Sequence, residues 1–162
     1  MLVKKVIVNS SPLIVLFKSQ QVALLPQLFS EIIVPGAVWR EVAASGKNDV
    51  PTLQLPNVSW AQQVEVTNVA SEIAAWDLGK GESEVLSLAR ENPDSVAIVD
   101  DRAARRCAKS LDIITMGTGG VLILAKQRGL IPSIAPKIQA LRDAGLWLSD
   151  PIVNLLKQKA GE

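Results

Sequence analysis

The chain of 162 residues contains no histidine and no tyrosine, and its only cysteine is Cys107. Without histidine, the Ser-His-Asp and Cys-His nucleophilic schemes are excluded, and so is any zinc site with histidine ligands. A single cysteine excludes an intramolecular disulfide and is consistent with a reducing compartment. The groups left for hydrolytic chemistry are carboxylates, alone or with an oxygen-ligated metal such as Mg²⁺ or Mn²⁺.

The sequence also lacks a strong net charge and a long apolar run. The formal net charge is +1, so contact with a nucleic acid would require a local basic patch rather than an overall field. No apolar stretch is long enough to span a bilayer, and we expect a soluble cytoplasmic protein without a membrane partner. The length and the 48% hydrophobic content predict one domain with a sizeable core.

Short β-branched or apolar runs alternate with helical patterns along the chain. Strands are expected at 6–8, 31–34, 60–66, 96–99 and 113–116. Helices are expected at 12–19, 22–29, 35–45, 69–76, 82–92, 102–111, 118–129, 134–145 and 150–160. Residues 45–58 contain a glycine and two prolines and predict a loop or an exposed insertion. The repeated order of strand and helix predicts an α/β fold with a central, mainly parallel sheet flanked by helices.

Polar residues follow two of the predicted strands. Asn9 comes directly after the strand at 6–8, and Ser11 is the expected N-cap of the next helix, with Pro12 at its first position. Asp100 and Asp101 follow the apolar strand at 96–99. Ligands bind at the carboxyl ends of strands in open α/β sheets, so these residues are candidates for a site. Adjacent acids repel each other unless a cation is close, although one of the two can instead cap the following helix.

Two glutamates lie at the edges of predicted apolar helix faces. Glu82 has apolar residues three, four and seven positions later, and Glu41 has them three and four positions earlier. A metal or catalytic role fits both, but Glu82 could also be a first-turn acid favoured by the helix dipole, and Glu41 could pair with a surface cation. Glu84 lies about 200° around the helix from Glu82 and is expected to face solvent.

A basic stripe follows the two aspartates. Arg102, Arg105, Arg106 and Lys109 are spaced i, i+3, i+4 and i+7, so they share one helix face. That face could hold the phosphates of a nucleic acid, or it could simply be solvated. Thr118 opens a glycine-rich helix start that could bind an anion, although "MGTGGV" matches no nucleotide-binding motif. The four tryptophans are scattered, and packing in the core or an interface is their default role.

The ordered set of a strand-end amide, two helical acids and strand-end acids resembles the PIN domain, a superfamily that includes the VapC toxins of toxin–antitoxin pairs. The stretches that carry this resemblance are "VNSSPLI", "VPGAVWREV", "LGKGESEVLSLA", "VDDRAARRCAKSLDI" and "MGTGGVLILAKQRGLI". They are most similar to a little-characterised prokaryotic branch of PIN-like proteins. The resemblance covers residues 5–132 and implies a PIN-like core in 1–132, with 133–162 forming C-terminal helices of the same domain.

The resemblance implies a metal-dependent endoribonuclease, with a toxin role, an antitoxin partner and a homodimer as further expectations. Transferred by position, the metal ligands are Asn9, Glu41, Glu82 and Asp100 or Asp101, the four acids are also the catalytic residues, and the metal is Mg²⁺ or Mn²⁺. Ser11, Arg102, Arg105 and Thr118 are the expected substrate-binding residues.

Asn9 departs from the family pattern, because most PIN nucleases have aspartate at this position. An amide oxygen can coordinate Mg²⁺ but carries no charge, so the metal site should be weaker. The alternative is therefore a weakly active or inactive PIN-fold module that binds RNA or another protein. A phosphatase of α/β type is less well supported, because the aspartate nucleophile expected after the first strand is missing.

Overall fold

The computed structural model describes residues 5–45 and 50–162, and its centre is a five-stranded parallel sheet in the order β3-β2-β1-β4-β5. The strands are β1 (Lys5–Val8), β2 (Glu31–Pro35), β3 (Ala61–Val64), β4 (Ser95–Ile98) and β5 (Thr115–Met116). The chain builds the sheet outward from β1 to β3 and then returns to place β4 on the other side of β1. This reversal creates a switch point between β1 and β4, where open α/β sheets bind ligands.

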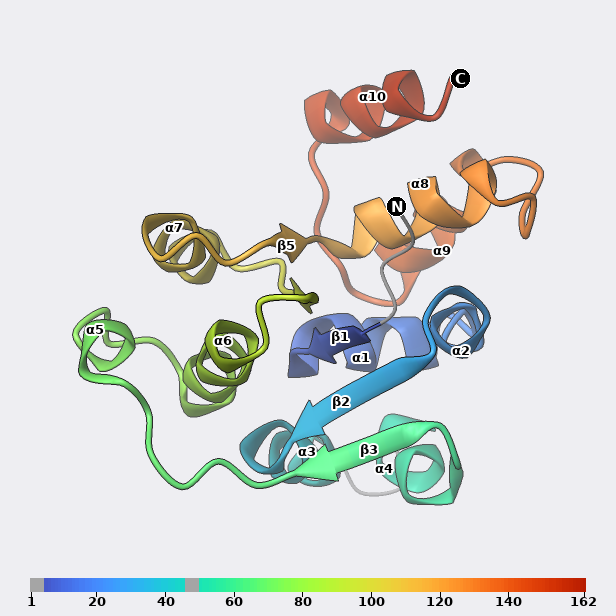
Figure 1. The fold of residues 1–162 in the computed structure, drawn as a ribbon. Helices are drawn as coiled ribbons and strands as arrows, with labels where there is room; N and C mark the ends of the chain where they lie inside the picture. The colour runs from blue at the N-terminus through green and yellow to red at the C-terminus, as the bar shows by residue number, and fades with distance from the viewer. Residues whose placement is uncertain (1–4, 46–49) are drawn as a thin grey trace.

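Helices connect the strands and flank the sheet (Figure 1). In chain order, the helical segments are α1 (Ser10–Lys18), α2 (Leu24–Leu28), α3 (Gly36–Ala44), α4 (Val50–Gln54), the 3₁₀ turn η1 (Leu55–Asn57), α5 (Ser71–Ala74), α6 (Lys80–Glu91), α7 (Arg102–Ser110), α8 (Thr118–Gln127), α9 (Ala135–Asp143) and α10 (Asp150–Lys159). Figure 1 shows α8, α9 and α10 grouped beyond the β5 side of the sheet. No helix in the described part of the chain is long and apolar enough to cross a membrane.

The inner strands β1 and β4 are apolar and buried, as expected for parallel strands covered on both faces. Their register pairs Val8 with Ile98, so the residues that follow the two strands lie side by side. The backbone N–H of Asn9 extends this pairing by donating to the carbonyl of Ile98 over 3.0 Å. The α/β fold predicted from the sequence is confirmed, and the sheet is parallel throughout.

Three local predictions were wrong, and the first two concern residues 45–58 and the start of the first helix. Residues 50–57 are not a loop: they form α4 and η1, although most of them are exposed, and 46–49 lie outside the described residues. Leu55 of this segment is buried in the core, and the Thr52 hydroxyl donates to the carbonyl of Val42 at the end of α3. The first helix begins at Ser10 with Asn9 as its N-cap, so Ser11 is not the cap and Pro12 is the third helical residue.

Glu84 does not face solvent as the helical period suggested. Its side chain is 2% exposed, and its carboxylate accepts the backbone N–H of Ala37 over 3.0 Å. Ala37 lies in the first turn of α3, where the helix dipole and free N–H groups favour an anion. The helix α3 packs on this side of α6, so Glu84 lies in the interface between two helices.

We expect Glu84→Ala to lower the free energy of unfolding by about 1–3 kcal/mol, because the buried N–H of Ala37 would lose its acceptor. Glu84→Gln should lose less, since an amide oxygen can accept the same hydrogen bond. Urea denaturation measures both changes, with Glu91→Ala as the control at the exposed end of the same helix. Equal stability of the Glu84→Ala and Glu91→Ala proteins would contradict this role for Glu84.

Candidate active site

Asn9 lies at the switch point between β1 and β4, and its side-chain oxygen accepts no hydrogen bond from the described residues. The residue is 4% exposed, and its Oδ1 atom is buried without a hydrogen-bond partner among the described residues. Although Asn9 is the N-cap of α1, its side chain makes no capping hydrogen bond. A buried acceptor without a partner is costly, so its retention at a strand end favours a binding role over a role in the turn.

Glu41 reaches this edge of the sheet from α3. Its Oε2 accepts the hydroxyl of Ser10 over 2.7 Å, and its Oε1 accepts the backbone N–H of Gly81 over 3.0 Å. Glu41 is not in any ion pair of the described residues; its neighbour Arg40 pairs with Glu65 instead. The two hydrogen bonds fix the Glu41 carboxylate between the starts of α1 and α6, and the alternative of a surface ion pair is not seen among the described residues.

Glu82 lies in the first turn of α6, next to Asp101. Its pKa is raised to about 7, first by burial, then by the charge and hydrogen bonding of Asp101 and by the charge of Glu41. A helix dipole acting alone would lower the pKa of a first-turn acid, so the neighbouring carboxylates and burial dominate here. The structure therefore brings Asp101 and Glu41 close enough to Glu82 to disfavour its ionisation.

Asp100 and Asp101 point to different partners. Asp100 accepts the backbone N–H and the hydroxyl of Thr118 over 2.8 and 2.6 Å, so both of its carboxylate oxygens are engaged at the start of α8. Asp101 caps α7 by accepting the N–H of Ala104 over 2.9 Å. Asp101 thus both caps α7 and interacts with Glu82. Capping and proximity to the acid cluster are therefore not divided between the two aspartates.

The expected substrate-binding residues differ in their placement. Thr118 is 0% exposed and both of its donors reach Asp100, so it orients that acid and offers no free hydroxyl to a surface ligand. Ser11 is exposed in the first turn of α1, and its side chain makes no hydrogen bond within the described part of the chain. Ser10 is the serine that contacts an acid of the site, and sequence reasoning missed it. Its position directly after Asn9 was the available signal.

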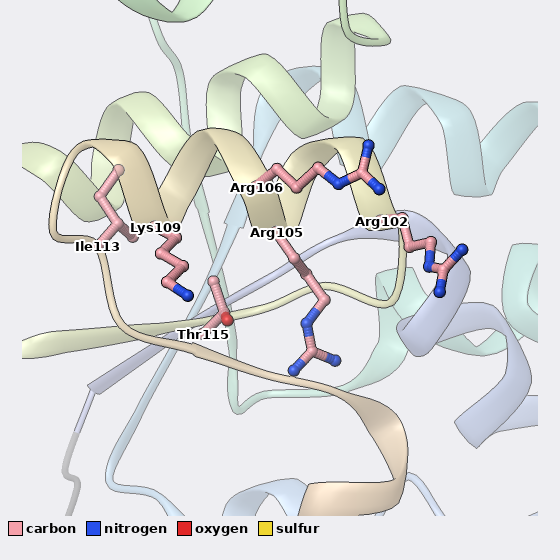
Figure 2. Close-up of a pocket in the computed structure, with 6 residues that line it drawn as sticks. All are labelled: Arg102, Arg105, Arg106, Lys109, Ile113 and Thr115. Carbon is pink, nitrogen blue, oxygen red and sulfur yellow. The ribbon is translucent and has the colours of Figure 1, made fainter. Parts of the chain in front are cut away.

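Arg102 and Arg105 lie on an exposed face of α7 that starts at this edge of the sheet. Together with Arg106, Lys109, Ile113 and Thr115 they line a groove of about 380 Å³ (Figure 2). In Figure 2, Arg105 and Lys109 extend from α7 over the segment that carries Thr115. The basic stripe predicted from the sequence therefore lines a groove, and this groove adjoins the carboxylates at the N-terminus of α7.

The site offers oxygen ligands for a hard cation, but not a compact cage. Among residues 5–45 and 50–162, no group of three or more acid, histidine or cysteine side chains converges closely enough to hold a metal. Mg²⁺ commonly retains several waters and needs only one or two carboxylates from the protein. The close pair of Glu82 and Asp101, with the unpartnered amide oxygen of Asn9 at the same edge, fits that mode of binding.

The raised pKa of Glu82 predicts a pH-dependent effect on stability without metal. The folded protein holds a proton at Glu82 that the unfolded chain releases, so this residue makes wild-type stability fall as pH rises from about 4.5 to about 7. Glu82→Gln removes that loss, and we expect its stabilisation over wild type to be small at about pH 5 and largest at about pH 8. Thermal unfolding in EDTA at several pH values measures the stability difference between Glu82→Gln and wild type, with Glu91→Gln as the control. Parallel pH profiles for wild type and Glu82→Gln would contradict a raised pKa at Glu82.

Comparison with known proteins agrees with the fold. A family model described as a PIN domain matches residues 5–162, from the first strand to the end of the described chain. No curated protein matches the chain. The match extends beyond the stretches that suggested the resemblance and includes the two C-terminal helices, and the parallel sheet with acids at its switch point agrees with it. The chain therefore belongs to the PIN domain family.

Proposed function

We propose that this protein hydrolyses phosphodiester bonds of RNA with the help of Mg²⁺ or Mn²⁺. The observation that carries the proposal is the pKa of Glu82, which burial and then the neighbouring carboxylates of Asp101 and Glu41 raise to about 7. A fold gains no stability from such crowding unless a cation relieves it, and crowded acids at a strand edge are typical of functional sites. PIN domains generally bind divalent metals, which is consistent with this chemistry.

The ligands we propose are Glu82 and Asp101, assisted by the Asn9 amide oxygen, with Glu41 and Asp100 completing the negative field. When bound, a divalent metal would activate water and stabilise the charge that develops on the phosphate. Ser10 and the N–H of Gly81 orient Glu41, and Thr118 orients Asp100.

The positive groups needed for substrate lie beside the acids. Arg102 follows Asp101 directly at the start of α7, and Arg105 is one turn further along the same exposed face. Neither forms an ion pair or hydrogen bond among the described residues, so both guanidinium groups can contact phosphate oxygens. A role as the toxin of a toxin–antitoxin pair, with an antitoxin partner and a homodimeric state, extends this proposal through the family and stays a prediction.

The first test is the response of Asn9→Asp to metal. Without metal, the added carboxylate joins a site already crowded with acids, so the unfolding midpoint should fall. With millimolar Mn²⁺ the same carboxylate becomes a ligand, and the metal-induced rise should exceed that of wild type; a hundredfold excess over Kd stabilises by roughly 2.7 kcal/mol. Thermal unfolding of both proteins with and without Mn²⁺ measures the difference, and equal shifts would exclude Asn9 from a metal site.

Cleavage of RNA by the same two proteins separates the candidate functions. We expect Mn²⁺-dependent cleavage that is slow in wild type, faster in Asn9→Asp and lost in Asn9→Asp combined with Glu82→Gln. If neither wild type nor Asn9→Asp cleaves RNA under conditions in which both bind Mn²⁺, the protein is instead a PIN-fold binding module, the alternative that the Asn9 amide already suggested.

A second test uses the close approach of Gly81 to Glu41. A Cβ atom at Gly81 would lie 2.6 Å from Oε1 of Glu41, so Gly81→Ala must displace that flexible carboxylate. Alanine suits a helix better than glycine, which offsets the loss of the hydrogen bond from the Gly81 N–H to Glu41. We therefore expect little net change in the unfolding midpoint, with weaker cleavage and a smaller Mn²⁺ shift. Gly79→Ala is the control, because its Cβ would meet Glu82 only at an ordinary 3.4 Å. Full activity of Gly81→Ala would show that the position of Glu41 is unimportant.

A further inference from the structure

The exposed face of α7 carries four cations that no protein group neutralises. Arg102, Arg105, Arg106 and Lys109 line one groove, and none of them has an ion pair or hydrogen bond within the described part of the chain. Elsewhere on this surface, cations such as Arg40 and Arg90 are paired with acids. Because the whole chain has a net charge of only +1, this face is a local positive surface that can bind an anionic ligand.

A second groove, of about 460 Å³, continues from the first one. The two share Arg105 and Thr115, and the second extends past Asp100 to Trp147 and the apolar face of α10. Trp147 is 81% exposed and also lines a third hollow in the loop before α10. Of the aromatic rings in the described residues, only Phe17 and Trp60 stack on each other, so the Trp147 indole is available to a ligand.

We propose that these connected grooves bind a single strand of RNA, with its phosphates along α7 and an unpaired base stacked on Trp147. The α7 face from Arg102 to Lys109 is about 10 Å long by the helical rise, so it can contact more than one phosphate. A positive groove beside an exposed aromatic ring is the combination that binds single strands without reading their sequence. A duplex keeps its bases stacked inside and could use only the cations.

The strand would enter the active site at the N-terminus of α7, where Asp101 caps the helix and contacts Glu82. This inference rests on the proposed function, since it names the substrate form and its path to the same site. It also assigns roles to Arg106, Lys109 and Trp147, which lie outside the acid cluster. The cations would supply salt-dependent attraction, whereas Trp147 would supply affinity that salt does not screen.

Fluorescence anisotropy tests the two roles separately. The probe is a labelled, unstructured RNA of about 12 nucleotides, a length within the range of single-strand sites, in EDTA so that no hydrolysis is required. Arg106→Ala with Lys109→Ala should reduce the slope of log K against log salt by roughly 1.4, at about 0.7 per lost phosphate contact. Trp147→Ala should weaken binding about tenfold with an unchanged slope, and Trp147→Phe should restore most of the loss.

The matched control is Arg90→Ala with Lys137→Ala, which removes the same charge from other faces of the molecule and should leave the salt slope near that of wild type. Four results would overturn the proposal: an unchanged slope in the α7 variant, an equal loss in the control, binding of the annealed duplex as tight as that of the single strand, or displacement of RNA by polyglutamate at equal charge. The last would identify an acidic protein as the ligand.

The outcome is independent of cleavage. If wild type binds the single strand as described but never cleaves it with Mn²⁺, the proposed nuclease activity fails and the binding groove stands. If the protein cleaves RNA and the α7 and Trp147 variants bind like wild type, the groove is wrong and the nuclease stands. Circular dichroism should show that the variants fold, because the side chains of Arg106, Lys109 and Trp147 are exposed.

Discussion

Carboxylates that accept backbone N–H groups at helix starts connect the elements around the edge of the sheet. Glu41 of α3 accepts from Gly81 in the first turn of α6, while Glu84 of α6 accepts from Ala37 in the first turn of α3. The two helices are thus joined by reciprocal hydrogen bonds, and Asp100 joins β4 to the start of α8 in the same way. Helix N-termini carry partial positive charge and unpaired donors, so they offset part of the repulsion that gathering these acids creates.

Against that background, the groups left without such partners are the informative ones. No donor among the described residues compensates the burial of Glu82, and burial together with the nearby Asp101 and Glu41 raises its pKa to about 7. The Oδ1 atom of Asn9 is buried without a partner at the end of the neighbouring strand. A carboxylate that resists ionisation and a buried amide oxygen without a donor both cost folding free energy, and the bound cation proposed above would relieve both costs.

The sequence predicted most of this edge because its signals are local. Strand ends follow from short apolar runs, so the positions of Asn9 and Asp100 could be derived, and one helical period placed Glu82 near the core. Glu84 was misplaced because a single apolar stripe describes one buried face, whereas α6 also packs against α3 on the side of Glu84. Which serine meets Glu41 depends on where α1 begins, and a shift of one residue exchanges Ser11 for Ser10.

The same geometry explains why acids and cations can lie so close together without neutralising each other. Asp101 accepts from Ala104 at the start of α7 and contacts Glu82, so its carboxylate is directed toward the sheet edge. The side chains of Arg105 and Lys109 leave the same helix on the face that overlies Thr115 (Figure 2). The acid and the cations of α7 are close but point in different directions. Asp101 lies at the N-terminal end of the helix axis, whereas residues three and four positions apart share one side of the helix. One short helix thereby presents an acidic cap at one end and a positive side face. Asp100 lines the same groove as Arg105, but Thr118 already engages both of its carboxylate oxygens, so the side face stays positive beside the acids.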